Sequence, residues 1–550
     1  MSNTNNNKIK QSLIIGALTS SFGVFVSKLL GLLYYSPLSS IAGESNMVFY
    51  STVYAYYETL LTISSAGIPF AIAALVAKYI AKKDYKTTLL VKKLGISITM
   101  ALSFVVALGF VLISTPLAKQ ALGSSAPQED VQNLKVLFNI LTIAIICVPY
   151  LSSLRGYVQG MKRMEIYAGS QVLEQFVRVF MIIICTVVFV TILNFDSIWA
   201  IYMAIAAASI GALIAIIFTK IMHKKDNERV HELANLQQTE PISKKEILKE
   251  LLYIGLPYLF ISVLGNAAAL INITFFMDYI CKVQGSGVYE TAKLSNGILN
   301  ANVGKLSTIP SILALGFGSG MVPYLTESLE QHDNIKISKQ VNQILDAVAF
   351  ILIPIILIFT FFGKDIYFIM YGNANLELGT KILIQSNLQT LLATICPILS
   401  SIMVTLKLRQ STINALYVAI VLKLLSFFPL VKYFGVYGMI YSGCIYYGVQ
   451  IIIYLIQLMK NFDVEIFTSI RRFINIIICS LIALLPALVI YEIIPFNYES
   501  RLLDIIYMGF IGIIIVIFYY GTSFAFELPQ EIFNIKDFDP IKLIKKFKKK

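Results

Sequence analysis

Long apolar stretches alternate with short polar segments along the whole chain of 550 residues. Each stretch reaches about 20 residues, which is the length that an α-helix needs to cross a bilayer. Because these stretches recur up to residue 527, the first is not a signal peptide in front of a soluble enzyme. The pattern predicts an all-α polytopic membrane protein with fourteen transmembrane helices. The expected spans are residues 13–41, 48–80, 94–118, 133–157, 166–193, 199–222, 251–277, 302–326, 341–362, 382–406, 412–431, 437–459, 473–494 and 503–527.

The composition supports this interpretation and excludes several classes of protein. Hydrophobic residues make up 57% of the chain and charged residues 14%, whereas a soluble domain has about 25% charged residues. The six cysteines are scattered and form no CxxC pair, so the sequence favours neither a disulfide scaffold nor a zinc site. The chain has no GxxxxGK[ST] loop for binding ATP, and the sequence predicts no metal and no cofactor.

The net charge of +13 fits topogenic charge in cytoplasmic loops better than nucleic-acid binding. If the N-terminus lies in the cytoplasm, the inner segments carry 30 Lys and Arg residues and the outer segments carry nine. Cytoplasmic loops of membrane proteins are enriched in these two residues. The sequence therefore predicts that both termini lie in the cytoplasm.

Features that recur in both halves of the chain indicate an internal repeat of six spans. Ile-Pro occurs early in the second and eighth spans, and Lys162 with Arg178 and Lys407 with Lys423 are each sixteen residues apart around spans five and eleven. Each match alone could be a coincidence. Units of six spans keep the same orientation, which predicts two parallel lobes with a substrate site between them. The expected segments are an N-lobe (1–222), a cytoplasmic linker (223–250), a C-lobe (251–459), two extra helices (460–527) and a basic cytoplasmic tail (528–550).

Several ionisable residues fall within the apolar stretches, where a charge at the bilayer centre costs about 2.5 to 3.5 kcal/mol. Lys28 lies halfway along the first span, and Lys305 opens the eighth. Glu58 lies in the second span among tyrosines, Lys423 lies in the middle of span eleven, and Asp278 closes span seven. Cavity-facing cations would suit an anionic group such as a diphosphate, and Lys28 and Lys305 are the candidates. Alternatively, these charges are structural or extend to the membrane surface.

A second group of charges lies between Leu154 and Val179, in the segment RGYVQGMKRMEIYAGSQVLEQFVRV. Glu174 and Arg178 are four residues apart, so they can pair on one helical face. Arg155 ends span four, where its side chain can extend to the cytoplasmic surface. We expect Glu174 and Arg178 either to brace the N-lobe or to belong to its moving gate.

This segment resembles the RGYFQG and QVxEQxxRV pattern of the Gram-positive polysaccharide-exporter branch of the MOP superfamily. That branch includes the MurJ-like lipid II flippases and their sporulation relatives. The resemblance covers nearly the whole chain. It continues through SKLLGLLYYSPL, SSAGIP, KLSTIPSILALGFGSGMVPYLTES, VLKLLSFFPL and GVYGMIYSG, and through Asp278 at the end of span seven.

The resemblance implies a 14-helix flippase that moves the undecaprenyl-pyrophosphate-linked peptidoglycan precursor lipid II from the inner to the outer leaflet of the bacterial cell membrane. In this family a cationic central cavity holds the pyrophosphate, and the last two helices help to form a groove for the lipid tail. Lys28 and Lys305 stand where relatives have cavity arginines. Tyr35 follows Tyr34 where Gram-positive relatives usually have arginine. With Glu58, the two tyrosines complete the candidate cavity residues.

The cavity is expected to be less basic than in relatives, because Thr62 and Ile63 stand where Gram-negative flippases have an arginine pair. The substrate could therefore be another polyprenyl-linked oligosaccharide, such as a capsule, teichuronic or spore glycan. A multidrug exporter of the same superfamily is less favoured, because such proteins resemble only the first twelve spans. A membrane enzyme is not favoured, because the sequence shows no surface carboxylates arranged for catalysis and no soluble domain.

The C-terminal segment DPIKLIKKFKKK has apolar residues at a spacing of three with lysines between them. Such a segment can lie on an anionic membrane surface, or it can be a solvated topogenic tail. The expected partners are lipid II or a similar glycan lipid and anionic membrane lipids, with no nucleic acid and with the protein as a monomer. Transport would be coupled to an ion gradient, to the membrane potential or to consumption of the product.

Overall fold

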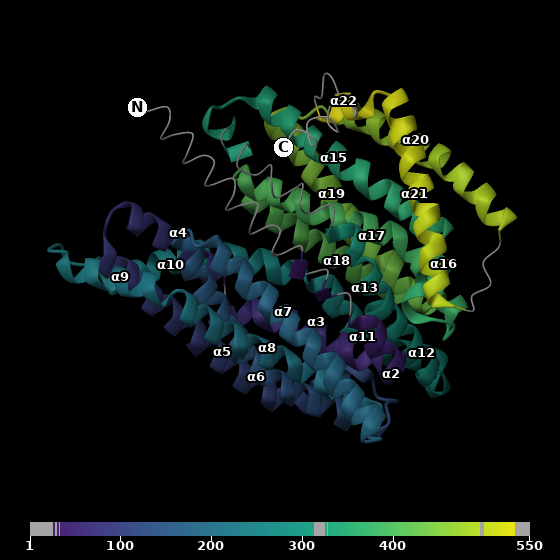
Figure 1. The fold of residues 1–550 in the computed structure, drawn as a ribbon, viewed down its shortest axis with the longest axis horizontal. Helices are drawn as coiled ribbons and strands as arrows, with labels where there is room; N and C mark the ends of the chain where they lie inside the picture. Colours follow the sequence, from purple (N-terminus) through teal and green to yellow (C-terminus); the bar gives the residue numbers. More distant parts are fainter. Residues whose placement is uncertain are drawn as a thin grey trace. The chain divides into compact units, whose positions relative to one another are not determined.

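The computed structural model describes residues 26, 27, 30, 31, 34–65, 67–312, 325, 326, 328–494 and 500–533. Within these ranges all regular structure is helical, which confirms the expected all-α fold (Figure 1). The chain divides into two compact units. Unit 1 comprises Met1–Lys305 and Lys423–Met439, and unit 2 comprises Leu306–Leu422 and Ile440–Lys550.

Unit 1 is built from long helices joined by short turns. Glycines with a positive backbone φ mark several of these turns, as at Gly67, where a left-handed backbone separates two helices. The helices are α2 (Tyr35–Ala42), α3 (Met47–Ser65), α4 (Ile68–Ala81), α5 (Tyr85–Leu122), α6 (Gln128–Gly160), α7 (Met164–Thr186), the π-helix η1 (Val187–Ile192), α8 (Ile198–Met222), α9 (Lys224–Leu236), α10 (Lys244–Gly265), α11 (Ala267–Gln284), the 3₁₀-helix η2 (Ser286–Val288), α12 (Tyr289–Gly297), the π-helix η3 (Ile298–Val303) and α13 (Gly304–Leu306), which ends in unit 2.

Unit 2 continues with helices of similar length, and α18 contributes its second half to unit 1. Its apolar core joins α15, α17 and α19, and a second cluster joins α15 to α20 and α21. The helices are α15 (Asn334–Phe361), α16 (Gly363–Tyr371), α17 (Leu376–Thr405), α18 (Arg409–Phe434), α19 (Val436–Phe462), α20 (Ile466–Ile493), α21 (Arg501–Ala525) and α22 (Leu528–Phe533).

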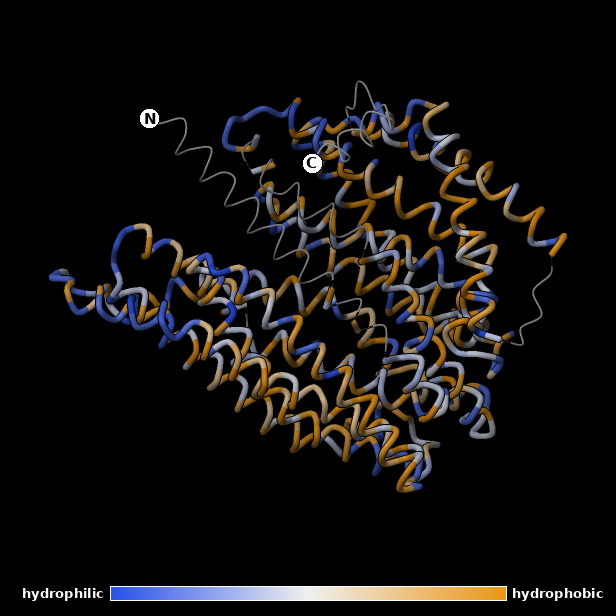
Figure 2. Tube along the Cα trace, in the orientation of Figure 1, coloured by the Kyte–Doolittle hydropathy of each residue, from blue (hydrophilic) through white to orange (hydrophobic). Residues whose placement is uncertain are grey.

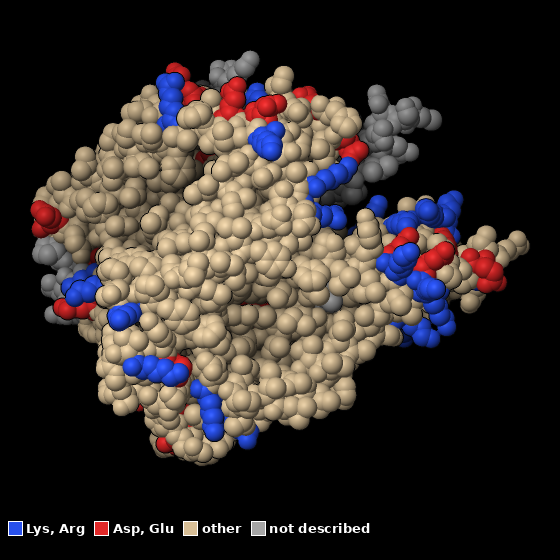
Figure 3. Space-filling model, turned by 180° about the vertical axis from the view of Figure 1, so that it is seen from behind, with Lys and Arg blue, Asp and Glu red and all other residues tan. Residues whose placement is uncertain are grey.

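Twelve helices in the described ranges are long and apolar enough to cross a membrane. They coincide with twelve of the fourteen expected spans, and the other two, 13–41 and 302–326, lie partly outside the described residues. The total of fourteen therefore stays a prediction. Apolar residues line the helices and hydrophilic residues gather at many of their ends (Figure 2), and the visible surface has broad areas without charged side chains (Figure 3).

The helices of unit 1 approach one another closely where glycine removes the side chain. A Cβ atom at Gly156 of α6 would lie 2.4 Å from the backbone oxygen of Pro69 in α4. A Cβ atom at Gly67 would lie 2.4 Å from the backbone oxygen of Gly255 in α10. Real atoms do not approach so closely, so α4 contacts both neighbours through backbone atoms.

The segment 223–250, expected to be a linker between lobes, forms α9 and the first turns of α10 within unit 1. Arg163 forms an ion pair with Asp226, which ties α9 to the start of α7. The expected lobe boundaries stay predictions, as does the basic tail 528–550, of which residues 534–550 lie outside the described residues.

Candidate functional site

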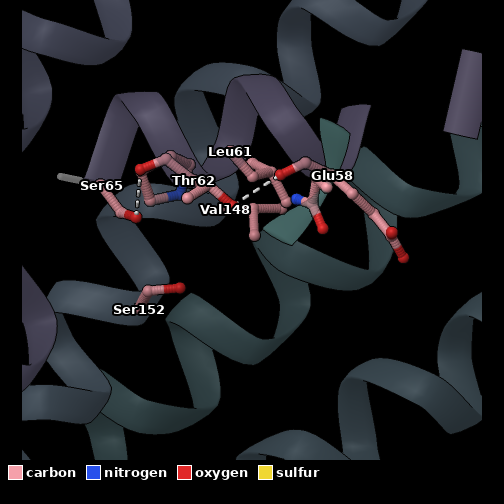
Figure 4. Close-up of a pocket in the computed structure, with 8 residues that line it drawn as sticks. Glu58, Leu61, Thr62, Ser65, Val148 and Ser152 are labelled. Atoms are coloured by element: carbon pink, nitrogen blue, oxygen red, sulfur yellow. Dashed lines mark hydrogen bonds between the residues drawn. The ribbon is translucent and has the colours of Figure 1, made fainter. Parts of the chain in front are cut away.

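A pocket of about 340 Å³ with both polar and apolar walls opens within unit 1 (Figure 4). Its walls come from α3, α6 and the junction of α10 with α11, and they include the carboxylate of Glu58 and the hydroxyls of Thr62, Ser65 and Ser152. The Thr62 hydroxyl donates to the backbone oxygen of Glu58 at 2.8 Å, so its hydrogen is used in a bond within α3. The Glu58 side chain is exposed, and its carboxyl group lines the pocket.

Lys305 lies beside two of the expected cavity residues. Its Nζ atom is 5.5 Å from the ring centroid of Tyr34 and 5.2 Å from that of Tyr35. Cations at such distances are attracted by the negative face of the ring. Lys305 is also within electrostatic range of Glu58 and Arg178. The structure therefore brings together four predicted site residues, and it adds Arg178, which was expected to have only a structural or gating role.

A run of tyrosines connects Lys305 to Arg178. The hydroxyls of Tyr34 and Tyr50 are 2.7 Å apart, and the rings of Tyr50 and Tyr54 are stacked with centroids 5.6 Å apart. The guanidinium carbon of Arg178 lies 5.3 Å from the Tyr54 ring centroid, and the Arg178 side chain is buried at 5% exposure. A guanidinium stacks well on aromatic rings because it is planar and weakly hydrated. The tyrosines thus partly replace water around a buried cation.

The pairing of Glu174 differs from the expectation. Glu174 forms an ion pair with Arg155 at 2.8 Å, and Arg178 stacks on Tyr54 instead. Arg155 does not extend to the surface, because its side chain is buried at 8% exposure and its Nε atom donates to the Ser170 hydroxyl at 2.6 Å. The pair links α6 to α7, which agrees with a bracing role.

The remaining predicted residues lie apart from this group or outside the described residues. Asp278 pairs with Lys282 one turn later and accepts a hydrogen bond from the Ser124 backbone. Lys423 is fully buried in α18, with its Nζ atom 5.9 Å from the ring centroid of Phe427. Lys28 lies outside the described residues.

Sequence reasoning missed Tyr50 and Asn266. Tyr50 lies four residues before Tyr54, a spacing that places both rings on one face of α3, so this signal was available. Asn266 stands in an apolar sequence and joins the pocket only because the chain turns between α10 and α11. Among the described residues, no group of three His, Cys, Asp or Glu side chains could hold a metal ion.

The chain forms two compact units of long apolar helices, and one unit contains buried cations and an exposed carboxylate. These features define a polytopic membrane protein built like a transporter. The chain matches the polysaccharide biosynthesis protein family over residues 13–329, more than half of its length. It therefore belongs to that family.

Two curated relatives come from Bacillus subtilis (strain 168). Lipid II flippase MurJ is 26% identical over 479 residues, which cover 86% of this chain and 87% of the relative. Stage V sporulation protein B is 24% identical over 385 residues, which cover 68% of this chain and 70% of the relative. The chain is thus similar to MurJ over most of the length of both proteins.

Solved structures show the same fold. Lipid II flippase MurJ in an inward closed conformation matches with a TM-score of 0.64 and 15% identity, covering 93% of this chain and 99% of that structure. An inward-facing multidrug resistance MATE transporter of the MOP superfamily matches with a TM-score of 0.60 and 14% identity, covering 81% of this chain and 94% of that structure. The chain therefore shares the fold of these MurJ and MATE structures.

Proposed function

We propose that this protein is a flippase that moves lipid II from the inner to the outer leaflet by alternating access. The observation that carries the proposal is the similarity to the flippase MurJ over 86% of this chain. The cations of unit 1 support it, because Lys305 and Arg178 lie together among tyrosines and would attract the pyrophosphate of a polyprenyl carrier. Lysine binds phosphate as a point charge, whereas arginine provides a planar fork.

In this proposal the protein lies in the bacterial cytoplasmic membrane with both termini inside. It works as a monomer, uses an ion gradient or the membrane potential, and contacts anionic lipids through residues 528–550. The excess of Lys and Arg in the inner segments supports this orientation. Lys28 is proposed as a further pyrophosphate contact, on the strength of its place in the sequence.

The test is rescue of bacteria depleted of their own lipid II flippase, with the leaflet distribution of labelled lipid II measured in the same cells. We expect growth and outward exposure of lipid II to return together. If the protein is inserted and abundant but lipid II stays in the inner leaflet, the lipid II assignment is wrong.

The residue-level test is Lys305→Ala in the same cells. We expect it to abolish rescue at normal membrane levels, because the substrate loses a cation held beside Tyr34 and Tyr35. The matched control is Lys225→Ala, which removes an exposed lysine from α9. Rescue by the Lys305→Ala variant would remove Lys305 from the substrate site.

A second candidate is export of another polyprenyl-linked oligosaccharide. The observation in its favour is the weaker basic character of the site, where Tyr35, Thr62 and Ile63 replace arginines that relatives have. Export of such a glycan by a host that lacks its own exporter, without any rescue of lipid II transport, would favour this candidate.

A further inference from the structure

Unit 2 contains a buried acid for which the proposed function has no role. Asp504 lies in the first turn of α21, and its side chain is fully buried at 0% exposure. In the part of the chain that the structure describes, neither carboxylate oxygen of Asp504 has a hydrogen-bond partner. Buried polar atoms are nearly always hydrogen-bonded, so two unpartnered oxygens on one side chain need an explanation.

A second buried acid lies on a helix that packs against α21. Asp365 lies in α16, which packs against α21, and it is buried at 1% exposure. The two carboxyl groups are close enough for their charges to interact. The hydroxyl of Tyr491 in α20 is 3.1 Å from each carboxylate oxygen of Asp365 and donates to that group.

An apolar cluster lies on the same three helices as this acid pair. Phe362, Leu484 and Ile511 are buried within the same cluster of α16, α20 and α21. An ionised carboxylate in such a place is costly unless it is paired, and two ionised carboxylates add their mutual repulsion. The Tyr491 hydrogen bonds stabilise charge on Asp365, whereas Asp504 has no hydrogen-bond partner among the described residues and only the N-terminus of α21 favours its charge.

We propose that Asp504 and Asp365 form a proton-binding site in unit 2, in which a single proton is carried by Asp504. The proton neutralises Asp504 and leaves one negative charge on Asp365, which the Tyr491 hydroxyl stabilises. Two carboxylates and a hydroxyl that is already donating provide few ligands for a metal ion, whereas a proton needs only one oxygen. This site does not rest on the proposed flippase activity.

The other polar groups near the pair leave this assignment unchanged. Tyr507, one turn beyond Asp504 on α21, donates to the backbone oxygen of Ile494 at 2.8 Å. Arg501 begins α21, but its side chain is exposed and its guanidinium lies against Gly372. Lys364 precedes Asp365 and is exposed. Release of the proton would place two like charges across the contact between α16 and α21 and weaken it.

The experiment uses the full-length protein in lipid nanodiscs, with infrared spectroscopy and thermal unfolding measured at neutral and alkaline pH. The variants are Asp504→Asn, which keeps the shape of the side chain and carries no titrating proton, and Glu492→Gln, which changes an exposed acid of α20 next to Tyr491. Infrared absorption detects a protonated carboxyl group directly, so the wild-type protein gives an answer even if a variant folds poorly.

We expect the wild-type protein to show a protonated carboxyl band at neutral pH that is absent from the Asp504→Asn variant and present in the Glu492→Gln variant. The folded protein would hold a proton that an exposed aspartate in the unfolded chain releases, so the unfolding temperature of wild type should fall by several degrees as pH rises. The Asp504→Asn variant should lose that part of the fall.

A missing carboxyl band in the wild-type protein would overturn the proposal. So would a pH dependence that is the same in wild type and Asp504→Asn. The third arm replaces choline chloride by sodium chloride at alkaline pH. If sodium raises the unfolding temperature of wild type and not of Asp504→Asn, the pair binds a metal ion and the proton assignment is wrong.

Discussion

Buried charged side chains have different partners in the two units. In unit 1 the buried cation Arg155 is compensated by an ion pair with Glu174. In unit 2 one buried acid, Asp346, pairs with Arg472 at 2.8 Å, whereas Asp504 has no hydrogen-bond partner among the described residues. A compensated ion braces helices, whereas an uncompensated one has to be neutralised by a ligand. The partners of a buried charge, more than its presence, therefore separate bracing from binding.

The largest effect is expected at the brace of unit 1. Glu174→Ala removes the partner of buried Arg155, and breaking a buried pair from one side costs about 3 to 5 kcal/mol because an uncompensated charge remains. The measurement is the free energy of unfolding of the purified protein in detergent. The control is Glu165→Ala on the same helix, whose ion pair with Arg163 is largely exposed and contributes about 0 to 1 kcal/mol. Equal effects of the two changes would show that the Arg155–Glu174 pair is not a brace.

A somewhat smaller effect is expected at the compensated acid of unit 2. Arg472→Ala leaves Asp346 buried at 2% exposure without its cation, and we expect a loss of about 3 kcal/mol in the free energy of unfolding. Arg472 also pairs with the half-exposed Glu531 of α22 at 2.9 Å. The control Glu531→Ala should therefore cost only about 1 kcal/mol or less. A loss in Glu531→Ala as large as that in Arg472→Ala would mean that α22, rather than Asp346, depends on the arginine.

The next largest effect on the free energy of unfolding is expected at Gly156, where α4 and α6 pack closely without charged groups. Gly156→Ala places a Cβ atom 2.4 Å from the Pro69 backbone oxygen, so α4 and α6 have to separate, at a cost of about 1 to 3 kcal/mol. Gly109→Ala in α5 is the control, because open space surrounds that position. It should stabilise the helix by about 0.5 to 1 kcal/mol. Stabilisation by Gly156→Ala would contradict the close approach of the two helices.

The smallest effect is a loss of stability at acidic pH through His223. Burial, as the main cause, lowers the pKa of His223, which lies between α8 and α9 and bonds to the Thr219 backbone oxygen through Nδ1. A histidine that is harder to protonate when folded contributes stability above its unfolded pKa of about 6.5, and this contribution is lost as pH falls through the lower folded value. Thermal unfolding at neutral and acidic pH should show this loss in wild type and less of it in His223→Gln. The same acid sensitivity in both proteins would exclude His223 as the cause.

The sequence predicted most of the fold because spans in a membrane are defined by length and apolarity, which are local properties. It predicted the wrong partner for Glu174 for the same reason. A spacing of four residues shows that Arg178 can reach Glu174 along a helix, but Arg155 arrives from α6 only when the hairpin of α6 and α7 closes. Local spacing does not reveal such competition between partners.

The candidate site was predictable only in part. Lys305, Tyr34, Tyr35 and Glu58 were expected from charge in apolar spans and from the resemblance, and the structure brings them near one another. Nothing in the sequence distinguishes Asp504 or Asp365 from acids at a membrane surface. Their burial depends on the packing of α16, which is distant in sequence, against α20 and α21.

The π-helix η3 sets the direction in which Lys305 points relative to α12, so the number of codons in this segment matters. It leads directly from α12 into α13, and the wide turn holds more residues than an α-helical turn would. Deleting one codon within residues 298–303 would allow a regular α-helix and rotate Lys305 by about 100° relative to α12. Every codon for a candidate site residue would remain, yet the lysine would no longer lie beside Tyr34 and Tyr35. The number of codons before Lys305 therefore matters as much to the candidate site as the lysine codon itself.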